Sequence, residues 1–391
     1  MKNILIHMIK TIIMAGGKGS RILPLTSIRP KPMIPVANRP LIHYIIEKLS
    51  IHGFKDLVVT LNYLPHEIKE SLKKNYSDLH ISYSQEKRAL GTAGGVRECK
   101  NIIEDTFMVL SGDVLVDMDW NKFLRFHREK KALASILLIP VEDPSHFGIA
   151  VLNENQKIVK FLEKPLPEEV FSKIANAGAY IFEKEIFEYI DEEKKEVDFS
   201  HDVFPRLIEE QAAIYGYTYH GYWNDVGRPN TYLKANYDVL NRIIGPEPRG
   251  KKLKERLGIY GDIWCGDNVF LEDPDKTRII GPVVIGNNCI IEKGSKIGRN
   301  TVLGDNVFIG RNCNISGSLI LNNSTIESNS YLKKCIIDTQ CTLEKGTIIE
   351  SGVILGSFVE TGSFSKVKSK NKVNSKIKIP ANSIIDSYYT L

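Results

Sequence analysis

Apolar residues recur with two different periods in the first 243 residues of the chain. Short apolar or β-branched runs typical of buried strands lie at Thr11–Met14, Leu57–Thr60, Phe107–Leu110 and Ala134–Val141. Stretches with apolar residues at three- and four-residue spacing, typical of helices, lie at Leu41–His52, Pro65–Lys74 and Trp120–Lys131. This alternation predicts an α/β, Rossmann-like domain with a mainly parallel sheet. Its ligand crevice should lie at the carboxyl ends of the strands.

A six-residue repeat replaces this pattern in the C-terminal part of the chain. Its aliphatic positions are Ile279, Ile285, Ile291, Ile297, Leu303, Ile309 and Ile315, and after one shift of frame Ile337, Leu343, Ile349 and Leu355. A fixed short repeat of this kind predicts a three-sided parallel β-helix in which each leading aliphatic residue points into the stack. Cys289 and Cys313, four places after an aliphatic position, are then interior packing residues.

These patterns divide the chain into three parts. Residues 1–243 form the expected α/β domain, and residues 244–260, with two prolines and a basic run, read as a linker. Residues 261–391 form the β-helix domain and include a lysine-rich tail after Gly356, which we interpret as a solvated last coil or extension.

Composition narrows the class of protein further. Of the 391 residues 42% are hydrophobic and 25% charged, which is typical of a soluble globular chain. The 52 basic and 47 acidic residues give a net charge of +5, which is too small to indicate nucleic-acid binding, and no apolar run is long enough to predict a membrane span. The six cysteines form no C-x-x-C pair, so we expect reduced thiols and a cytoplasmic protein.

The N-terminus has some features of a signal peptide, because Lys2 is followed by apolar residues. His7 and Lys10 interrupt that apolar run, which disfavours this alternative. Met8 offers a second start, so residues 1–7 are a candidate extension whose native status is open.

The densest chemical pattern, residues 14–33, begins at the end of the first predicted strand. From its small and cationic residues we select Ala15, Gly16, Gly17, Gly19, Arg21 and Lys31. Glycines allow backbone N–H groups to approach phosphate oxygens closely, and the two cations add positive charge, so this segment is a candidate triphosphate cradle. Its spacing is not that of a P-loop.

The complete string resembles the signature of the sugar-1-phosphate nucleotidylyltransferases, also called nucleoside-diphosphate-sugar pyrophosphorylases. Further motifs of that family follow in order along the chain: Gln85 to Gly94 is similar to the base-reading segment, Ser111-Gly112-Asp113 to the G-D motif, Phe161 to Pro165 to the sugar-phosphate motif, Asn176-Ala177-Gly178 to the strand under the sugar ring, and Trp223 to Gly227 to the W-x-D-V-G motif. The departures are small: Ser20 stands where Thr is commoner, and Ile22-Leu23 where Leu usually follows Arg directly.

The resemblance implies a role for each matching residue. Implied nucleotide-binding residues are Ala15, Gly16, Gly17, Gly19, Gln85, Gly91 and Thr92; implied catalytic residues are Arg21, Lys31, Asp113, Lys164 and Asp225; implied sugar-phosphate contacts are Gly148, Glu163, Lys164 and Asn176. Asp113 and Asp225 would hold Mg²⁺. The implied fold is a GT-A-like nucleotidyltransferase domain followed by a left-handed parallel β-helix.

The implied reaction joins a sugar 1-phosphate to the α-phosphorus of a nucleoside triphosphate and releases pyrophosphate. A sugar phosphate is already ionised at neutral pH, so positioning and charge neutralisation can carry the catalysis without a strong general base. The blocks at 142–150, 198–205 and 221–223 look most like mannose-1-phosphate guanylyltransferases, which favours GTP with mannose 1-phosphate. UTP, dTTP or ATP with glucose or N-acetylglucosamine 1-phosphate remains an alternative.

Two further alternatives concern the second domain and the loss of activity. Some hexapeptide β-helices are histidine-dependent acyltransferases, but all nine histidines here, the last being His220, precede the repeat. A silent regulatory paralogue should lack a charged motif residue, and none is missing. We therefore expect the β-helix to serve regulation or assembly into a homo-oligomer, with neither nucleic acid nor membrane as a partner.

Overall fold

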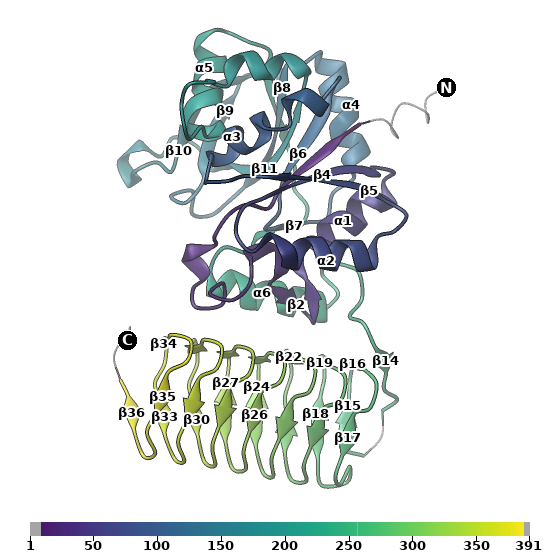
Figure 1. The fold of residues 1–391 in the computed structure, drawn as a ribbon, viewed down its shortest axis with the longest axis vertical. Helices are drawn as coiled ribbons and strands as arrows, with labels where there is room; N and C mark the ends of the chain where they lie inside the picture. Colours follow the sequence, from purple (N-terminus) through teal and green to yellow (C-terminus); the bar gives the residue numbers. More distant parts are fainter. Residues whose placement is uncertain (1–8, 256, 387–391) are drawn as a thin grey trace. The chain divides into compact units, whose positions relative to one another are not determined.

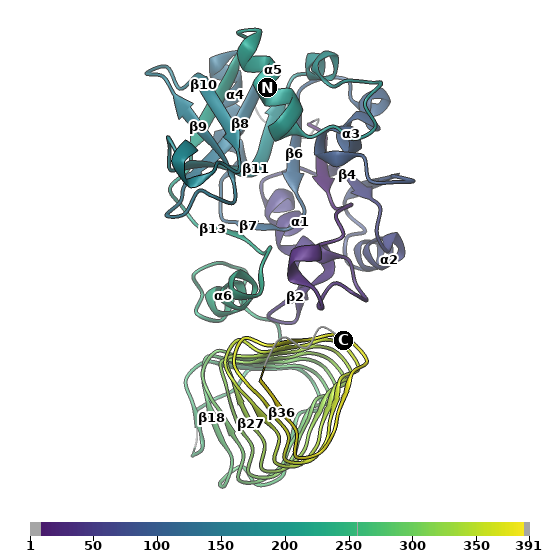
Figure 2. The same ribbon diagram turned by 90° about the vertical axis from the view of Figure 1, so that its left-hand side faces the viewer.

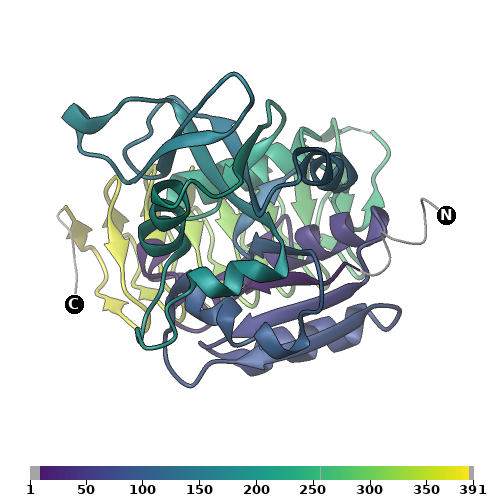
Figure 3. The ribbon, with the colours of Figure 1, turned by 90° about the horizontal axis from the view of Figure 1, so that it is seen from above.

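Nine strands of the N-terminal half form one sheet in a computed structural model, which describes residues 9–255 and 257–386. The strands along its main path are β10 (Ile158–Glu163), β9 (Gly148–Leu152), β11 (Ile174–Phe182), β6 (Phe107–Ser111), β1 (Thr11–Met14), β4 (Asp56–Leu61) and β5 (His80–Gln85), while β8 (Ala134–Pro140) pairs with β11 and β12 (Ile214–Thr218) with β8. The strands β5, β4, β1 and β6 run parallel, as Figure 3 shows for the purple β1 and the blue strands beside it. The α/β prediction is confirmed.

One strand of the sheet runs in a direction that the sequence did not indicate. β11 lies antiparallel to both β6 and β8, so β11 runs against the four parallel strands and β8 runs with them. The carboxyl ends of the four parallel strands therefore make one edge, at which the glycine-rich segment begins after β1.

Helices cover both faces of this sheet (Figure 1). They are α1 (Leu41–Ile51), α2 (Pro65–Asn75), α3 (Gly91–Arg97), α4 (Trp120–Lys130) and α5 (Phe204–Glu209). Alternate residues of a strand point to opposite faces. Accordingly Ile13 packs in one core with α1, α2 and α4, and Ile12 packs in the other core with α3 and α5.

The hexad repeat forms a parallel β-helix with three sheets, whose three sides are visible along the stack in Figure 2. The first sheet contains β14 (Lys251–Lys252), β16 (Ile263–Cys265), β19 (Val283–Ile285), β22 (Thr301–Leu303), β25 (Leu319–Ile320), β28 (Ile336–Ile337), β31 (Ile354–Leu355) and β34 (Lys372–Val373). The second contains β15 (Ile259–Tyr260), β18 (Arg278–Ile280), β21 (Lys296–Ile297), β24 (Asn314–Ser316), β27 (Tyr331–Lys333), β30 (Ile348–Ile349), β33 (Lys366–Val367) and β36 (Ile384–Ile385). The third contains β17 (Phe270–Leu271), β20 (Ile290–Ile291), β23 (Phe308–Ile309), β26 (Thr325–Ile326), β29 (Thr342–Leu343), β32 (Glu360–Thr361) and β35 (Lys378–Ile379).

The shift of frame in the repeat is the loss of one residue in two successive coils. Ile285 pairs with Leu303, a step of three hexads, whereas Leu303 pairs with Ile320 and Ile320 with Ile337, each one residue fewer. The lysine-rich tail continues the same stack, since Val367, Val373, Ile379 and Ile385 remain in its core.

The interior of the stack is apolar and includes five of the six cysteines. Cys265, Cys289, Cys313, Cys335 and Cys341 lie in this core, which confirms the packing interpretation of Cys289 and Cys313. All six cysteines are free and buried. Burial raises the pKa of the Cys289 thiol to about 11, so this side chain stays a protonated apolar group at neutral pH.

Asparagine makes the corners of several coils. Asn288, Asn306 and Asn323 have φ between 55° and 60°, a left-handed conformation that asparagine adopts more readily than most residues. Their amides also bond along the stack, from Asn288 Nδ2 to Asn306 Oδ1 at 3.1 Å and from Asn306 Nδ2 to Asn323 Oδ1 at 2.8 Å.

The chain divides into two compact units that do not follow the order of the sequence. The first consists of Met1–Lys18, Pro30–Met33 and Leu41–Asn224, and the second of Gly19–Arg29, Ile34–Pro40 and Asp225–Leu391. The second unit thus holds the β-helix, helix α6 (Pro229–Leu240), the short strands β2 (Pro35–Val36) and β3 (Arg39–Pro40), and part of the glycine-rich segment.

The candidate extension at residues 1–7 lies outside the described residues. Within the described ranges, no helix combines the length and apolarity that a membrane span requires.

Candidate active site

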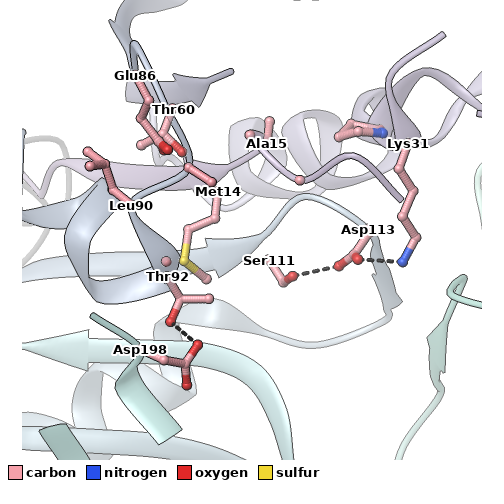
Figure 4. Close-up of a pocket in the computed structure, with 16 residues that line it drawn as sticks. Met14, Ala15, Lys31, Thr60, Glu86, Leu90, Thr92, Ser111, Asp113 and Asp198 are labelled. Atoms are coloured by element: carbon pink, nitrogen blue, oxygen red, sulfur yellow. Dashed lines mark hydrogen bonds and ion pairs between the residues drawn. The ribbon is translucent and has the colours of Figure 1, made fainter. Parts of the chain in front are cut away.

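The first unit contains a pocket of about 320 Å³ at the carboxyl ends of its parallel strands. Its walls come from the ends of β1, β4 and β6, from the segment after β5 and from the start of α3, and they consist of Met14, Ala15, Gly16, Gly17, Lys31, Pro32, Thr60, Glu86, Ala89, Leu90, Gly91, Thr92, Gly95, Ser111, Asp113 and Asp198. Figure 4 shows ten of these residues labelled. Seven of the predicted site residues line it: Ala15, Gly16, Gly17, Lys31, Gly91, Thr92 and Asp113.

The glycines at the mouth of this pocket differ in how much space surrounds them. A Cβ added at Gly17 would meet nothing within 4 Å, so this backbone faces open space. A Cβ at Gly16 would lie 3.2 Å from Glu86 Oε1. Bare backbone at both positions leaves N–H groups accessible to an anion.

Lys31 and Asp113 form a nearly buried ion pair in the pocket wall. Lys31 Nζ lies 2.5 Å from Asp113 Oδ2, and the lysine side chain is only 7% exposed. Ser111 Oγ donates to the other carboxylate oxygen, at 2.5 Å (Figure 4). Lys31 is therefore not the solvated loop lysine that its place between two prolines would ordinarily suggest, and the pair fixes both charges at the end of β6.

Glu86, which the sequence analysis did not select, enters the pocket in place of its neighbour. Gln85 is the last residue of β5, is exposed, and accepts a bond from Lys69 Nζ at 2.9 Å outside the pocket walls. Glu86 follows it and packs its carboxylate over Gly95, where an added Cβ would come within 2.6 Å of Oε1. Burial raises the pKa of this carboxyl above its usual range.

The loop before α3 is held against a distant segment. Gly91 has φ +79°, and an added Cβ would lie 2.4 Å from the carbonyl oxygen of Val197. Val197 N–H donates to Leu90 at 2.8 Å, and Thr92 Oγ1 donates to Asp198 Oδ2 at 2.8 Å. Asp198, a second pocket residue that sequence analysis missed, thus fixes the hydroxyl of Thr92.

The predicted sugar-phosphate residues form a separate group on β9 and β10. Gly148 pairs with Glu163, and a Cβ at Gly148 would lie 2.6 Å from Glu163 Oε2. The Glu163 side chain is 13% exposed, whereas that of Lys164 is 58% exposed, with its Nζ 3.3 Å from Glu163 Oε1. Lys164 also has φ +47°, so its backbone is held in a conformation that is costly for a lysine.

Asn176 is committed to shaping β11. Its Oδ1 accepts from the N–H of Gly178 at 3.0 Å, and its Nδ2 donates to Tyr180 Oη at 3.0 Å and Ser200 Oγ at 3.3 Å. Gly178 has φ +77°, and the pairing of β11 with β8 is irregular between Asn176 and Tyr180. The N-A-G string thus forms an irregular turn within a strand.

The remaining predicted residues lie in the second unit. Gly19 has φ 65° and accepts a bond from Thr26 Oγ1 at 2.9 Å on its carbonyl. Arg21 Nη2 lies 3.9 Å from Asp225 Oδ2, with side chains 51% and 18% exposed. A guanidinium and a carboxylate predicted to serve one reaction are thus paired within this unit.

The comparisons with known proteins agree with this geometry. A family model described as nucleotidyl transferase matches residues 10–242, and one described as GMPPB C-terminal domain matches residues 279–390. A UTP–glucose-1-phosphate uridylyltransferase of Synechocystis is 35% identical over 323 residues, covering 75% of this chain and 82% of that protein. A mannose-1-phosphate guanylyltransferase of Mycobacterium tuberculosis is 31% identical over 294 residues, covering 74% and 79%.

A solved structure supports the fold of the first domain. The crystal structure of HddC from Yersinia pseudotuberculosis, complexed with GMP-PN, matches with a TM-score of 0.51 and 26% identity over 59% of this chain and 98% of that one. The first match spans well over half of the chain and includes the whole glycine-rich segment and the pocket. The chain therefore belongs to the sugar-1-phosphate nucleotidyltransferase family, with a C-terminal parallel β-helix.

Proposed function

We propose that this protein transfers GMP from GTP to mannose 1-phosphate, giving GDP-mannose and pyrophosphate. The observation that carries the base choice is the Glu86 carboxylate in the wall of the pocket. The relatives do not decide the substrate, because one is named for UTP and glucose 1-phosphate and the other for mannose 1-phosphate.

Guanine matches a carboxylate better than the other bases do. Its Watson–Crick edge presents two adjacent donors, N1–H and N2–H₂, which the two oxygens of one carboxylate can accept. Uracil and thymine present one donor between two carbonyl acceptors, and adenine presents an acceptor beside its donor, so an ionised Glu86 would face a repelling oxygen or lone pair. This favours GTP over UTP, dTTP and ATP.

Backbone and cationic groups supply the remaining nucleotide contacts in this proposal. The N–H groups at Gly16 and Gly17 would hold the triphosphate, and Arg21 would stabilise charge on the leaving pyrophosphate. Glu163 would accept bonds from the sugar hydroxyls, while the exposed Lys164 would hold the phosphate of the incoming sugar.

Members of this family generally use a divalent metal, and the residues present suit Mg²⁺. Asp113 and Asp225 offer hard carboxylate oxygens. Among the described residues there is no group of three or more His, Cys, Asp or Glu side chains that could hold a metal by itself, so substrate groups would have to complete the shell. Mg²⁺ commonly binds one or two carboxylates and completes its shell with substrate phosphates and water. When bound, it would neutralise phosphate charge during the attack.

Glu86→Gln tests the base proposal. The amide offers one acceptor and one donor, so one guanine bond is lost and a donor faces a donor. We expect GTP affinity to fall roughly 10- to 100-fold, the equivalent of about 1.5–3 kcal/mol for a bond to a charged group. Affinities for UTP and dTTP should rise, because the amide donor replaces the carboxylate oxygen that repels their carbonyl groups. Isothermal titration of both proteins with the four nucleotides measures this. Glu129→Gln, which changes an exposed carboxylate outside the pocket walls, is the control.

The pH dependence separates this role from a structural one. Guanine needs the ionised form, so GTP affinity of the unmodified protein should fall as the pH drops through the raised pKa of Glu86, and this dependence should vanish in Glu86→Gln. A raised pKa means that folding favours the protonated form, so this group contributes least to stability at neutral pH. The Glu86→Gln variant should therefore melt no lower than the unmodified protein. Unchanged GTP affinity in this variant would contradict the proposal.

A further inference from the structure

The boundary between the two compact units runs through the glycine-rich segment. Gly16, Gly17 and Lys18 belong to the first unit, whereas Gly19–Arg29, including Arg21, belongs to the unit that contains the β-helix. The half of this segment that carries the arginine is therefore organised by contacts with residues more than 300 positions later in the chain.

The strongest of these contacts is a buried ion pair. Arg29 Nη1 donates to Asp338 Oδ1 at 2.6 Å, and Arg29 Nη2 donates to Thr339 Oγ1 at 2.7 Å. The side chains of Arg29 and Asp338 are 11% and 0% exposed. Ser357 Oγ donates to the other oxygen of the Asp338 carboxylate, at 2.8 Å.

Asp338 is out of place in the pattern of the β-helix. It follows Ile337, which lies in one inward-facing row with Ile285, Leu303, Ile320 and Leu355. Three of these four are followed by glycine and Ile320 is followed by Leu321, so none of the four is followed by a charged residue. A carboxylate is costly to bury unless it is paired. Besides Arg29, the Asp338 carboxylate accepts bonds from Ser357 Oγ and from the N–H of Thr339, at 2.7 Å. These two bonds fix the carboxylate within the coil, and the carboxylate in turn fixes the orientation of the Arg29 guanidinium.

Arg29 is linked to Arg21 by a short bonded segment. Arg29 Nη1 also donates to the carbonyl of Leu25 at 3.2 Å, and the N–H of Leu25 donates to Ile22 at 3.1 Å. Thr26 Oγ1 closes the segment by donating to the carbonyl of Gly19. A displacement of the Arg29 guanidinium would therefore be passed to the backbone on both sides of Arg21.

We propose that Arg29 and Asp338 are positioning residues, through which the β-helix fixes the Gly19–Arg21 backbone for the triphosphate. This inference rests on the proposed function, in which Arg21 binds the leaving pyrophosphate. It gives the β-helix a part in catalysis by the same chain, in addition to any part in assembly.

The test is a double-mutant cycle with Arg29→Met, Asp338→Ser and the double variant in the full-length protein. Each single change should raise KM for the triphosphate or lower kcat so that kcat/KM falls about tenfold, with KM for the sugar 1-phosphate within twofold. Because both changes break the same contact, the double variant should also lose about tenfold rather than a hundredfold. Arg311→Gln, which breaks the exposed Arg311–Glu272 pair of 2.9 Å elsewhere on the β-helix, should change nothing.

A second measurement does not depend on activity. Hydrogen exchange of the amides in 19–29 should quicken at least tenfold in Asp338→Ser, while amides in the later coils keep their protection. If the single variants fold poorly, Thr339→Val removes only the second acceptor of Arg29 and should show the same changes in reduced form. Unaltered kinetics and unaltered exchange in folded variants would overturn the proposal. Faster exchange in a protein without transferase activity would instead retain the positioning contact and reject the proposed function.

Discussion

Replacing Arg21 with alanine is expected to lower kcat by ~10²-fold or more, the size of effect seen when one preorganised transition-state donor is removed. The side chain is 51% exposed and its ion-pair distance to Asp225 is 3.9 Å, so the folded protein depends little on it. The loss should therefore appear without a fall in the melting temperature. Pyrophosphate release at saturating substrates with Mg²⁺ measures it.

Two companion variants sharpen this prediction. Asp225→Ala should lose a similar factor, because it removes a proposed metal ligand, whereas Arg249→Ala, an exposed arginine of the same unit, should retain full activity. Near-full turnover by Arg21→Ala or Asp225→Ala would contradict the role given to that residue.

Gly91→Ala is expected to abolish most nucleotide binding and to destabilise the fold. The added methyl group would lie 2.4 Å from a backbone oxygen that cannot easily move, since the Val197 carbonyl accepts from Gly94 N–H at 3.0 Å. The positive φ costs a non-glycine residue about 1–2 kcal/mol, and the clash adds roughly 1–3 kcal/mol. We expect an unfolding free energy lower by about 2–5 kcal/mol and nucleotide affinity lower by at least tenfold.

Gly17→Ala provides the matched control. A methyl group there would meet no atom within 4 Å, so thermal stability should be unchanged, but the side chain would obstruct the proposed approach of phosphate to the backbone. A melting temperature unchanged in Gly91→Ala, or full nucleotide affinity in Gly17→Ala, would contradict these two readings.

Local patterns were sufficient to predict most of the fold. The strands and helices of the first domain were visible because their apolar periods differ, and the hexad positions were visible because one residue type must fill one place in every coil. The antiparallel direction of β11 could not be predicted, since a buried strand has the same apolar composition whichever way it runs.

The pocket shows where motif matching reaches its limit. Whether Gln85 or Glu86 enters depends on where β5 ends, because successive residues of a strand point to opposite faces. The sequence contains both residues and does not show which of the two points into the pocket. Asp198 was missed for another reason: it meets Thr92 only through tertiary folding, 106 residues away.

One feature of the sequence does indicate that another segment packs on the β-helix. The outward positions of one sheet, Val284, Val302, Leu319, Ile336 and Ile354, are apolar and at most 2% exposed. Outward positions of the second sheet include exposed Lys296 and Asn314. Apolar outward residues on one of the three sheets predict that this side of the stack is covered by another segment. The pattern does not identify that segment.

Transfer of GMP to mannose 1-phosphate is best tested by measuring pyrophosphate release with Mg²⁺ across GTP, UTP, dTTP and ATP, each combined with mannose, glucose and N-acetylglucosamine 1-phosphates. We expect release concentrated at GTP with mannose 1-phosphate. Release concentrated at another pair would retain the reaction and reject the proposed substrates. No release in any combination, from folded protein that still binds nucleotide, would contradict the proposed activity and make a silent regulatory relative the better description.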